Sequence, residues 1–477
     1  MRARRLPACL LVAALLGGCD LGVPGDRFPL RPPPAGRLRP QALVVGLVGT
    51  LSGPDSWRGE DAFEGADLGV HVLNRERPGD ARPFELRPLD DGGDPLEAAG
   101  LVEELAALES TVGIVYAGPP EGLARATEAL ESAGIPGILC YGDPLGAAAS
   151  SGHVFQVSPP LAGQARRLVS YILGDRGYAK VGVIAERSPT GAAAVAALRA
   201  SLDGAARREA VVRYAPGRRD LRPLLARLRR ARVEAVVVQG SPAATTAALA
   251  GLRGLGAAYR STAAARIASA PRAARARRLR SGWWHPQVVG FDTAVSPRTR
   301  GARPGTAGAD TYVRGAHYLP LAPLRSFRRA FRDWWGMRPL GWQQRAYDAA
   351  LMIGWAAGRG ARRGDLAATL EGLRGGRFSG LPVTFGKEDH VAPGDSAVGL
   401  WVVPRPGIGV RERRIEPGFV SFPWVPLART FTTAGGRTTL PASDWPALFG
   451  RSRYASRPPH YARMLWGVRT PSSDPVH

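Results

Sequence analysis

Side chains that could catalyse a reaction or bind a metal ion are scattered along this chain rather than grouped. The seven histidines are His71, His153, His285, His317, His390, His460 and His477. None belongs to an H-E-x-x-H pair, and the chain has neither a G-x-S-x-G motif nor a phosphate-binding G-x-x-x-x-G-K-S/T loop. The sequence therefore predicts no enzyme, no metal site and no cofactor.

One acidic cluster, Asp90, Asp91 and Asp94, has a composition that could suggest metal ligands. A calcium loop of this kind requires a glutamate at its end, and the segment lacks one. Aspartate and glycine are also the residues expected in a turn that follows a strand. We favour the turn.

The chain begins with a segment typical of export. Three arginines in the first five residues precede an apolar run at residues 6–16, which is too short for a bilayer span of about twenty residues. Residues 1–18 are therefore predicted to be a signal peptide. The sequence Leu16-Gly17-Gly18-Cys19 resembles the bacterial lipobox, which implies that the Cys19 thiol receives a diacylglycerol and anchors the protein in the membrane.

The cysteine content fits an anchored, exported chain. Cys9 would leave with the signal peptide and Cys19 would carry lipid, so only Cys140 remains and no internal disulfide can form. Residues 19–40, with six prolines, form the predicted tether between membrane and folded body. We expect the body on the extracytoplasmic face of the cell membrane, either periplasmic or on the outer surface.

The formal net charge of +24 is unevenly distributed. Residues 41–150 hold 19 acidic residues and 6 arginines, whereas residues 201–300 hold 20 arginines and 5 acidic residues. This asymmetry indicates two separate bodies, and solvated faces of opposite sign explain it more simply than a charged partner does. The basic residues lack regularly interleaved aromatics, so we expect no nucleic-acid partner.

The body alternates between strand and helix patterns. Strands are predicted at 41–49, 84–89, 112–116, 135–141, 180–185 and 233–239, and helices at 60–74, 96–108, 120–133, 163–173, 191–202, 221–230 and 242–255. Alternation of this kind predicts an α/β fold with two doubly wound parallel-sheet lobes, which meet near Pro159. Ligands of such sheets bind at the carboxyl ends of the strands, here the loops at 50–57, 117–122, 141–145, 188–191, 240–242 and 290–293.

Several segments, in order and spacing, resemble one known family. They are VVGLVGTLSGPDSWRGEDAFEGADLGVHVLN (44–74), LDDGGDP (89–95), AGIPGIL (133–139), VFQVSPP (154–160), VGVIAERSPTG (182–191), FRRAFRDWWGMRPLGWQQRAYDAALMIGWA (327–356) and FSGLPVTFGKEDH (378–390). Across about residues 42–403 the chain resembles type 1 periplasmic binding proteins, close to the leucine/isoleucine/valine-binding branch of ABC importers. The resemblance implies a three-strand hinge, with crossings near Pro159, residues 315–320 and residues 380–382.

The resemblance also implies a division of the chain. Residues 41–158 and 316–380 would form the N-terminal lobe, and residues 159–315 and 381–403 the C-terminal lobe. An Arg- and Ala-rich insertion at 257–284 could be a solvated helix, a disordered insertion or a patch for anionic lipids or wall polymers. Residues 404–477, with eleven prolines, are expected to be irregular chain pinned by Trp424, Trp445 and Trp466, or a partner-docking arm.

Candidate ligand residues follow from the strand ends and the resemblance together. They are Ser52, Trp57, Tyr116, Gly118, Pro119, Tyr141, Asp143, Thr190, Ser241 and Asp292. Relative to the amino-acid binders of the family, Gly118 and Pro119 stand where serines hold the carboxylate of the ligand, and Asp292 stands where a glutamate pairs with its amine. Trp57 could instead be a packed aromatic, Asp143 a helix cap and Asp292 a turn residue.

The loss of hydroxyl donors and the gain of Asp143 would disfavour a free carboxylate. The predicted ligand is therefore a neutral or cationic small molecule, such as an amide or amine, rather than a branched-chain amino acid. The predicted function is that of a lipid-anchored solute-binding protein that delivers this ligand to an ABC permease. The alternative, from another class, is a sensor or regulator of the same fold that acts through a protein partner. An exported enzyme would require a nucleophile or metal constellation that the sequence does not show.

Overall fold

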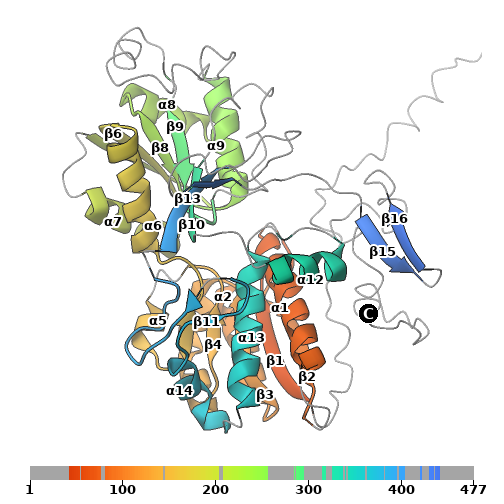
Figure 1. Ribbon diagram of the computed structural model, residues 1–477. Helices are drawn as coiled ribbons and strands as arrows, with labels where there is room; N and C mark the ends of the chain where they lie inside the picture. Colours follow the sequence, from red (N-terminus) through yellow and green to blue (C-terminus); the bar gives the residue numbers. More distant parts are fainter. Residues whose placement is uncertain are drawn as a thin grey trace, which may run out of the picture.

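The computed structural model places two α/β lobes one above the other (Figure 1). It describes residues 42–53, 55–76, 81–142, 146–202, 208–255, 284, 286–294, 314–318, 325–336, 339, 342–359, 362–380, 382–394, 397–402, 419–421, 429–433 and 436–440. The predicted signal peptide, Cys19, the tether and Asp143 lie outside these residues. No described helix combines the length and apolar character needed to span a membrane.

The first lobe is built on a five-stranded parallel sheet in the order β2-β1-β3-β4-β5. Its strands are β1 (Leu43–Gly49), β2 (Phe84–Asp90), β3 (Thr111–Ala117), β4 (Gly137–Leu139) and β5 (Val154–Gln156). All of β3 is buried, as expected for a parallel strand with helices on both faces. The predicted doubly wound fold is confirmed in this lobe.

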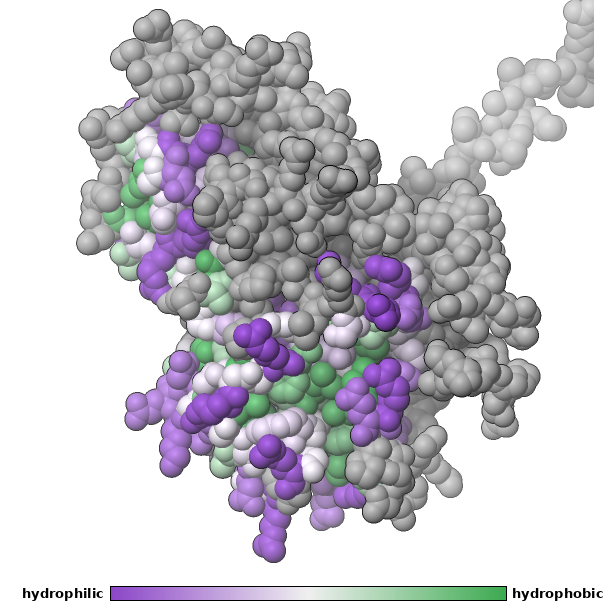
Figure 2. Space-filling model, viewed as in Figure 1, coloured by the Kyte–Doolittle hydropathy of each residue, from purple (hydrophilic) through white to green (hydrophobic). Residues whose placement is uncertain are grey.

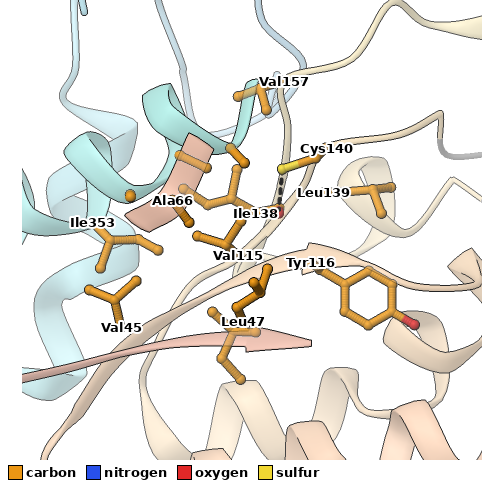
Figure 3. Close-up of a cluster of buried hydrophobic side chains, with 14 of the residues drawn as sticks. Val45, Leu47, Ala66, Val115, Tyr116, Ile138, Leu139, Cys140, Val157 and Ile353 are labelled. Atoms are coloured by element: carbon orange, nitrogen blue, oxygen red, sulfur yellow. Dashed lines mark hydrogen bonds between the residues drawn. The ribbon is translucent and has the colours of Figure 1, made fainter. Parts of the chain in front are cut away.

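Helices cover both faces of the first sheet. They are α1 (Trp57–Glu76), α2 (Pro95–Ala107), α3 (Pro120–Arg125), α4 (Thr127–Ala133), α5 (Ala147–Ser150), α12 (Arg325–Trp335), α13 (Gln343–Gly358) and α14 (Leu366–Glu371), with the 3-10 turn η2 (Arg363–Asp365). A Cβ on Gly113 would meet Ile353 of α13, whereas one on Gly46 would meet Leu105 of α2. Figure 3 shows the resulting core, with Tyr116 directed away from Ile353 and Cys140.

The acidic cluster after β2 is a turn, as predicted. Asp94 caps α2, because its carboxylate accepts the Leu96 N–H at 2.7 Å, and Pro95 occupies the first helical turn. Asp90 Oδ1 accepts the N–H groups of Leu51 and Gly92. Within the described chain, no three His, Cys, Asp or Glu side chains are grouped so that they could hold a metal ion.

The second lobe has a seven-stranded sheet in the order β14-β13-β10-β9-β8-β6-β7. Its strands are β6 (Lys180–Glu186), β7 (Arg208–Tyr214), β8 (Ala235–Val238), β9 (Gln287–Gly290), β10 (Arg314–Tyr318), β13 (Val398–Val402) and β14 (Phe419–Ser421). Only the β10–β13 pairing is antiparallel. The helices are α6 (Leu161–Val169), the π-helical η1 (Ser170–Asp175), α7 (Pro189–Leu202), α8 (Arg222–Arg230) and α9 (Pro242–Gly254).

The chain passes between the lobes after β5, after β10 and before β13. The first passage leads from β5 to α6, and the second follows β10, whose last residue is Tyr318. The third passage comes later than residues 380–382. A short hairpin, β11 (Gly376–Arg377) with β12 (Pro382–Val383), precedes it, and Phe385 and Ala392 still pack in the first-lobe core.

Parts of the C-terminal extension are more regular than expected. Strand β14 adds to the second sheet beside β13, and β15 (Arg429–Thr433) pairs with β16 (Gly436–Leu440) in an antiparallel hairpin. The three tryptophans predicted as anchors lie outside the described residues. Of the Arg-rich insertion only Trp284 is described, and its indole donates to the Val233 carbonyl at 2.8 Å.

The described surface is mostly polar. Figure 2 shows hydrophilic side chains projecting around a more apolar area on the first lobe. Among the described residues, Leu96 is the one large apolar side chain that is fully exposed, at 67%. Apolar burial therefore takes place inside each lobe.

Candidate ligand-binding site

The lobes meet at the carboxyl ends of strands from both sheets. Arg345, in the first turn of α13 in the first lobe, contacts Asp292, which follows β9 in the second lobe. Strand β1 leads into the Trp57 loop and β4 leads to Tyr141, so both residues reach the same edge of the first sheet. The structure thus brings together Trp57, Tyr141 and Asp292 from the predicted set.

An aromatic wall forms the first-lobe side of this junction. The Trp57 ring lies 5.7 Å from the Tyr141 ring, edge to face, and 4.7 Å from the Trp342 ring, centroid to centroid. All three side chains are buried. Such edge-to-face contacts add to apolar burial and fix the ring orientations. Trp57 is therefore packed in the core of the first lobe rather than on its surface, and a contact between Trp57 and a ligand stays a prediction.

Arg58 extends along this wall. Its guanidinium carbon lies 5.5 Å from the Trp57 ring centroid and 6.0 Å from that of Tyr141. The Tyr141 hydroxyl donates to the Arg58 carbonyl at 3.2 Å, which holds the start of α1 against the end of β4. A cation and two aromatic faces therefore share one corner of the junction.

Charged groups of the two lobes also act on one another. Burial raises the pKa of Glu186, at the end of β6, and the first-lobe carboxylate of Asp55 raises it further, while Arg58 opposes both. Burial likewise raises the pKa of Tyr214, at the end of β7, with Glu186 and Asp55 adding to the shift. The Glu186 carboxylate of the second lobe is thus influenced by two charged groups of the first lobe, Asp55 and Arg58.

The position of Gly118 is filled by a neighbouring carboxylate. A Cβ built on Gly118 would lie 2.1 Å from Asp91 Oδ2, so a serine cannot occupy this position without displacing Asp91. Asp91 is 1% exposed, and its Oδ1 accepts bonds from the Thr50 hydroxyl and the Gly93 N–H. Burial raises the pKa of Asp91 to about 6. The group nearest to this position is therefore a carboxylate, with the Tyr116 hydroxyl next to it at 3.0 Å from the same Cβ.

Asp292 and Arg345 form a buried ion pair between the lobes. Arg345 Nη2 lies 2.9 Å from Asp292 Oδ2, and the side chains are 4% and 2% exposed. Each is also held within its own lobe. Arg345 Nη1 donates to the Cys140 carbonyl at 3.1 Å, and the Asp292 N–H donates to Gln164 Oε1 at 2.9 Å. Asp292, which the sequence analysis gives as the partner of a ligand amine, is thus already paired with Arg345 of the same chain.

The other predicted residues have local structural roles. Tyr116 is fully buried, and its hydroxyl donates to the carbonyl of Pro119, which directly precedes α3. Ser241 caps α9 by accepting the Ala244 N–H at 3.3 Å, and Thr190 lies in the first turn of α7. The Ser52 N–H donates to Asp90. These contacts leave the assignment of ligand roles to Ser52, Thr190 and Ser241 as a prediction.

Sequence reasoning missed Arg58, Trp342, Arg345 and the pair Asp55 and Glu186. A signal existed for Arg345, since α13 is apolar or small apart from Gln343, Gln344, Tyr347 and Asp348, and a buried charge in such a helix requires a partner. The partner, 53 positions earlier in sequence and in the other lobe, cannot be identified from helical periodicity.

The fold and the strand-end junction agree with one family. Residues 42–402 match the family described as Periplasmic binding protein, and the chain belongs to it. No curated protein matches the chain.

Solved structures show the same fold at low sequence identity. A type 1 periplasmic binding protein from Bordetella pertussis is 19% identical over 75% of this chain and 96% of its own, with a TM-score of 0.61. The substrate-binding protein LivJ from Streptococcus pneumoniae, in complex with isoleucine, is 18% identical over 73% and 97%, with a TM-score of 0.57. A solute-binding protein from Rhodopseudomonas palustris, in complex with 3,4-dihydroxy benzoic acid, is 14% identical over 84% and 96%, also with 0.57.

Proposed function

We propose that this chain is a lipid-anchored, extracytoplasmic solute-binding protein that captures a small polar molecule between its lobes and delivers it to an ABC importer. The observation that carries the proposal is that aromatic side chains of the first lobe and charged side chains of both lobes come together at the strand ends. Two lobes joined by a hinge can close on a ligand, which shifts the balance between open and closed forms by its preference for the closed one.

The proposed ligand is neutral or cationic, such as an amide, an amine or an amino-acid-like molecule. Gly118 supplies no hydroxyl, and Asp91 lies against it. A ligand carboxylate placed there would be repelled by Asp91, and the neighbouring carboxylate of Asp90 adds negative charge. The proteins of this fold named above bind isoleucine and 3,4-dihydroxy benzoic acid, so the fold itself does not fix the ligand.

A thermal-shift screen against amino acids, amides, polyamines and short peptides tests this proposal. A ligand present at a hundred times its Kd stabilises the folded protein by about 2.7 kcal/mol and so raises the unfolding midpoint. We expect amides or amines to raise it and L-leucine to leave it unchanged. Tight binding of L-leucine in calorimetry would refute the proposed ligand class.

The aromatic wall provides a mutational test. Trp57→Ala should weaken binding of the best ligand from the screen at least about tenfold, because a buried aromatic contact of this kind contributes ~1.4 kcal/mol or more. Leu96→Ala is the control for a truncation at an exposed position of the same lobe. Equal affinities of Trp57→Ala and the wild type would place the ligand elsewhere.

The lipid anchor is tested separately by fractionation. Cys19→Ser removes the thiol that would carry diacylglycerol, so we expect the protein to move from the membrane fraction to the soluble fraction. Cys9→Ser, a change of the same kind within the predicted signal peptide, should leave it in the membrane. If Cys19→Ser protein remains fully membrane-bound, Cys19 is not the anchor.

A further inference from the structure

The ion pair between Arg345 and Asp292 joins groups that are fixed on opposite sides of the junction. The Arg345 guanidinium donates to the carbonyl of Cys140, which follows β4, and lies 6.0 Å from the Tyr141 ring centroid. The Asp292 backbone is held by Gln164, whose side-chain amide also donates to the Pro159 carbonyl in the first passage between lobes. Separation of the lobes must therefore break the pair or pull it from these supports.

Both charged groups of this contact are buried, so the loss of either one is costly to the other. At 4% and 2% exposure, neither group can replace its partner with bulk water while the lobes stay together. Removal of one partner from a buried pair leaves an uncompensated charge and is strongly destabilising. Asp292 consequently requires a cation whenever the lobes are closed.

We infer that Arg345 is a specificity-determining residue: it supplies from within the chain the cation that Asp292 requires, and so excludes the cationic group of a ligand from that carboxylate. The inference about ligands rests on the proposed function, whereas the internal pairing does not. An amine ligand, which the proposed function allows, would have to place its ammonium elsewhere than beside Asp292.

The experiment replaces the internal cation by an external one. Full-length wild type, Arg345→Ala and the double variant Arg345→Ala/Asp292→Asn are purified in detergent without ligand. Each is measured by thermal unfolding and by hydrogen exchange at residues 286–294, with and without millimolar methylguanidinium. In Arg345→Ala the midpoint should fall by roughly 5 °C or more, and exchange should accelerate, because Asp292 loses its cation.

In Arg345→Ala, methylguanidinium should reverse part of the fall in the unfolding midpoint and part of the loss of protection against hydrogen exchange, since it can occupy the space left beside Asp292. It should have no effect on the wild type, where Arg345 already occupies the carboxylate, or on the double variant, where the carboxylate is gone. Equal effects on all three proteins, or none on Arg345→Ala, would overturn the inference.

Asp292→Asn alone serves if Arg345→Ala fails to fold. It should also accelerate exchange at the junction and be insensitive to methylguanidinium; protection equal to that of the wild type would count against the pair. Because these measurements use methylguanidinium as a probe and not the ligand sought in the screen, a failed screen would leave their outcome unaffected, and their failure would leave the proposed capture of a solute standing.

Discussion

Gly65→Ala should lower the free energy of unfolding by about 3 kcal/mol or more, the upper range for overpacking a tight interface. Gly65 lies in α1 where this helix crosses α13. A Cβ there would lie 1.9 Å from the Gln343 carbonyl oxygen and 2.9 Å from the Tyr347 nitrogen. Both atoms belong to the backbone, so no side-chain rotation can relieve the clash, and the two helices must move apart. Urea unfolding followed by circular dichroism measures the change.

Gly100→Ala is the matched control. Gly100 also lies within a helix, α2, but a Cβ there would meet no atom within 4 Å. Alanine favours the helix over glycine, so this variant should be more stable by about 1 kcal/mol. If Gly65→Ala were equally well tolerated, the close crossing of α1 and α13 would not exist in solution. Because Gln343 and Arg345 lie in the same helix, that result would also undermine the placement of the site.

Asp348→Asn should remove much of the loss of stability that the wild type shows between about pH 5 and pH 8. Asp348 lies in α13, buried, and accepts the Ser379 hydroxyl at 2.7 Å. Burial raises its pKa to about 8. The unfolded chain releases this proton near the ordinary value, so between the two values the folded state holds more protons and stability falls as pH rises.

The expected size follows from the same linkage. For each pH unit between the pKa of Asp348 in the unfolded chain and that in the folded protein, the wild type loses up to about 1.4 kcal/mol of its free energy of unfolding. Asp348→Asn should therefore be more stable than the wild type by about 2 kcal/mol or more at pH 8, and by much less at pH 5. Asp220→Asn is the control. Asp220 is exposed, and hydrogen bonds from Arg222 lower its pKa, so its replacement should not flatten the profile. A wild-type profile without a decline would contradict the burial of Asp348.

The fold could be predicted from the sequence where each element carries its own periodic pattern. The predicted strands at 84–89, 112–116 and 180–185 and the helices at 96–108 and 242–255 are confirmed within a residue or two. The helix predicted at 120–133 is interrupted at Ala126, between α3 and α4. Strand β7, at the edge of the sheet, was not predicted, because its sequence REAVVRY has only a short apolar run between charged residues and lacks a clear alternation.

The candidate site was predictable only in part. The loops after parallel strands could be located from sequence, since the fold brings these ends together. Which side chains meet across the junction depends on how the lobes approach each other. That is why Asp292 was predicted as a ligand residue without its partner Arg345, and why the proximity of Asp55 to Glu186 could not be anticipated.

A crystal structure of the protein with the best ligand from the screen tests the central claim most directly. The account predicts a neutral or cationic molecule between the lobes, in contact with the wall of Trp57, Tyr141 and Trp342 on one side and with the strand ends of the second lobe on the other. A ligand bound away from this junction, or a carboxylate of the ligand held beside Gly118 and Asp91, would contradict it.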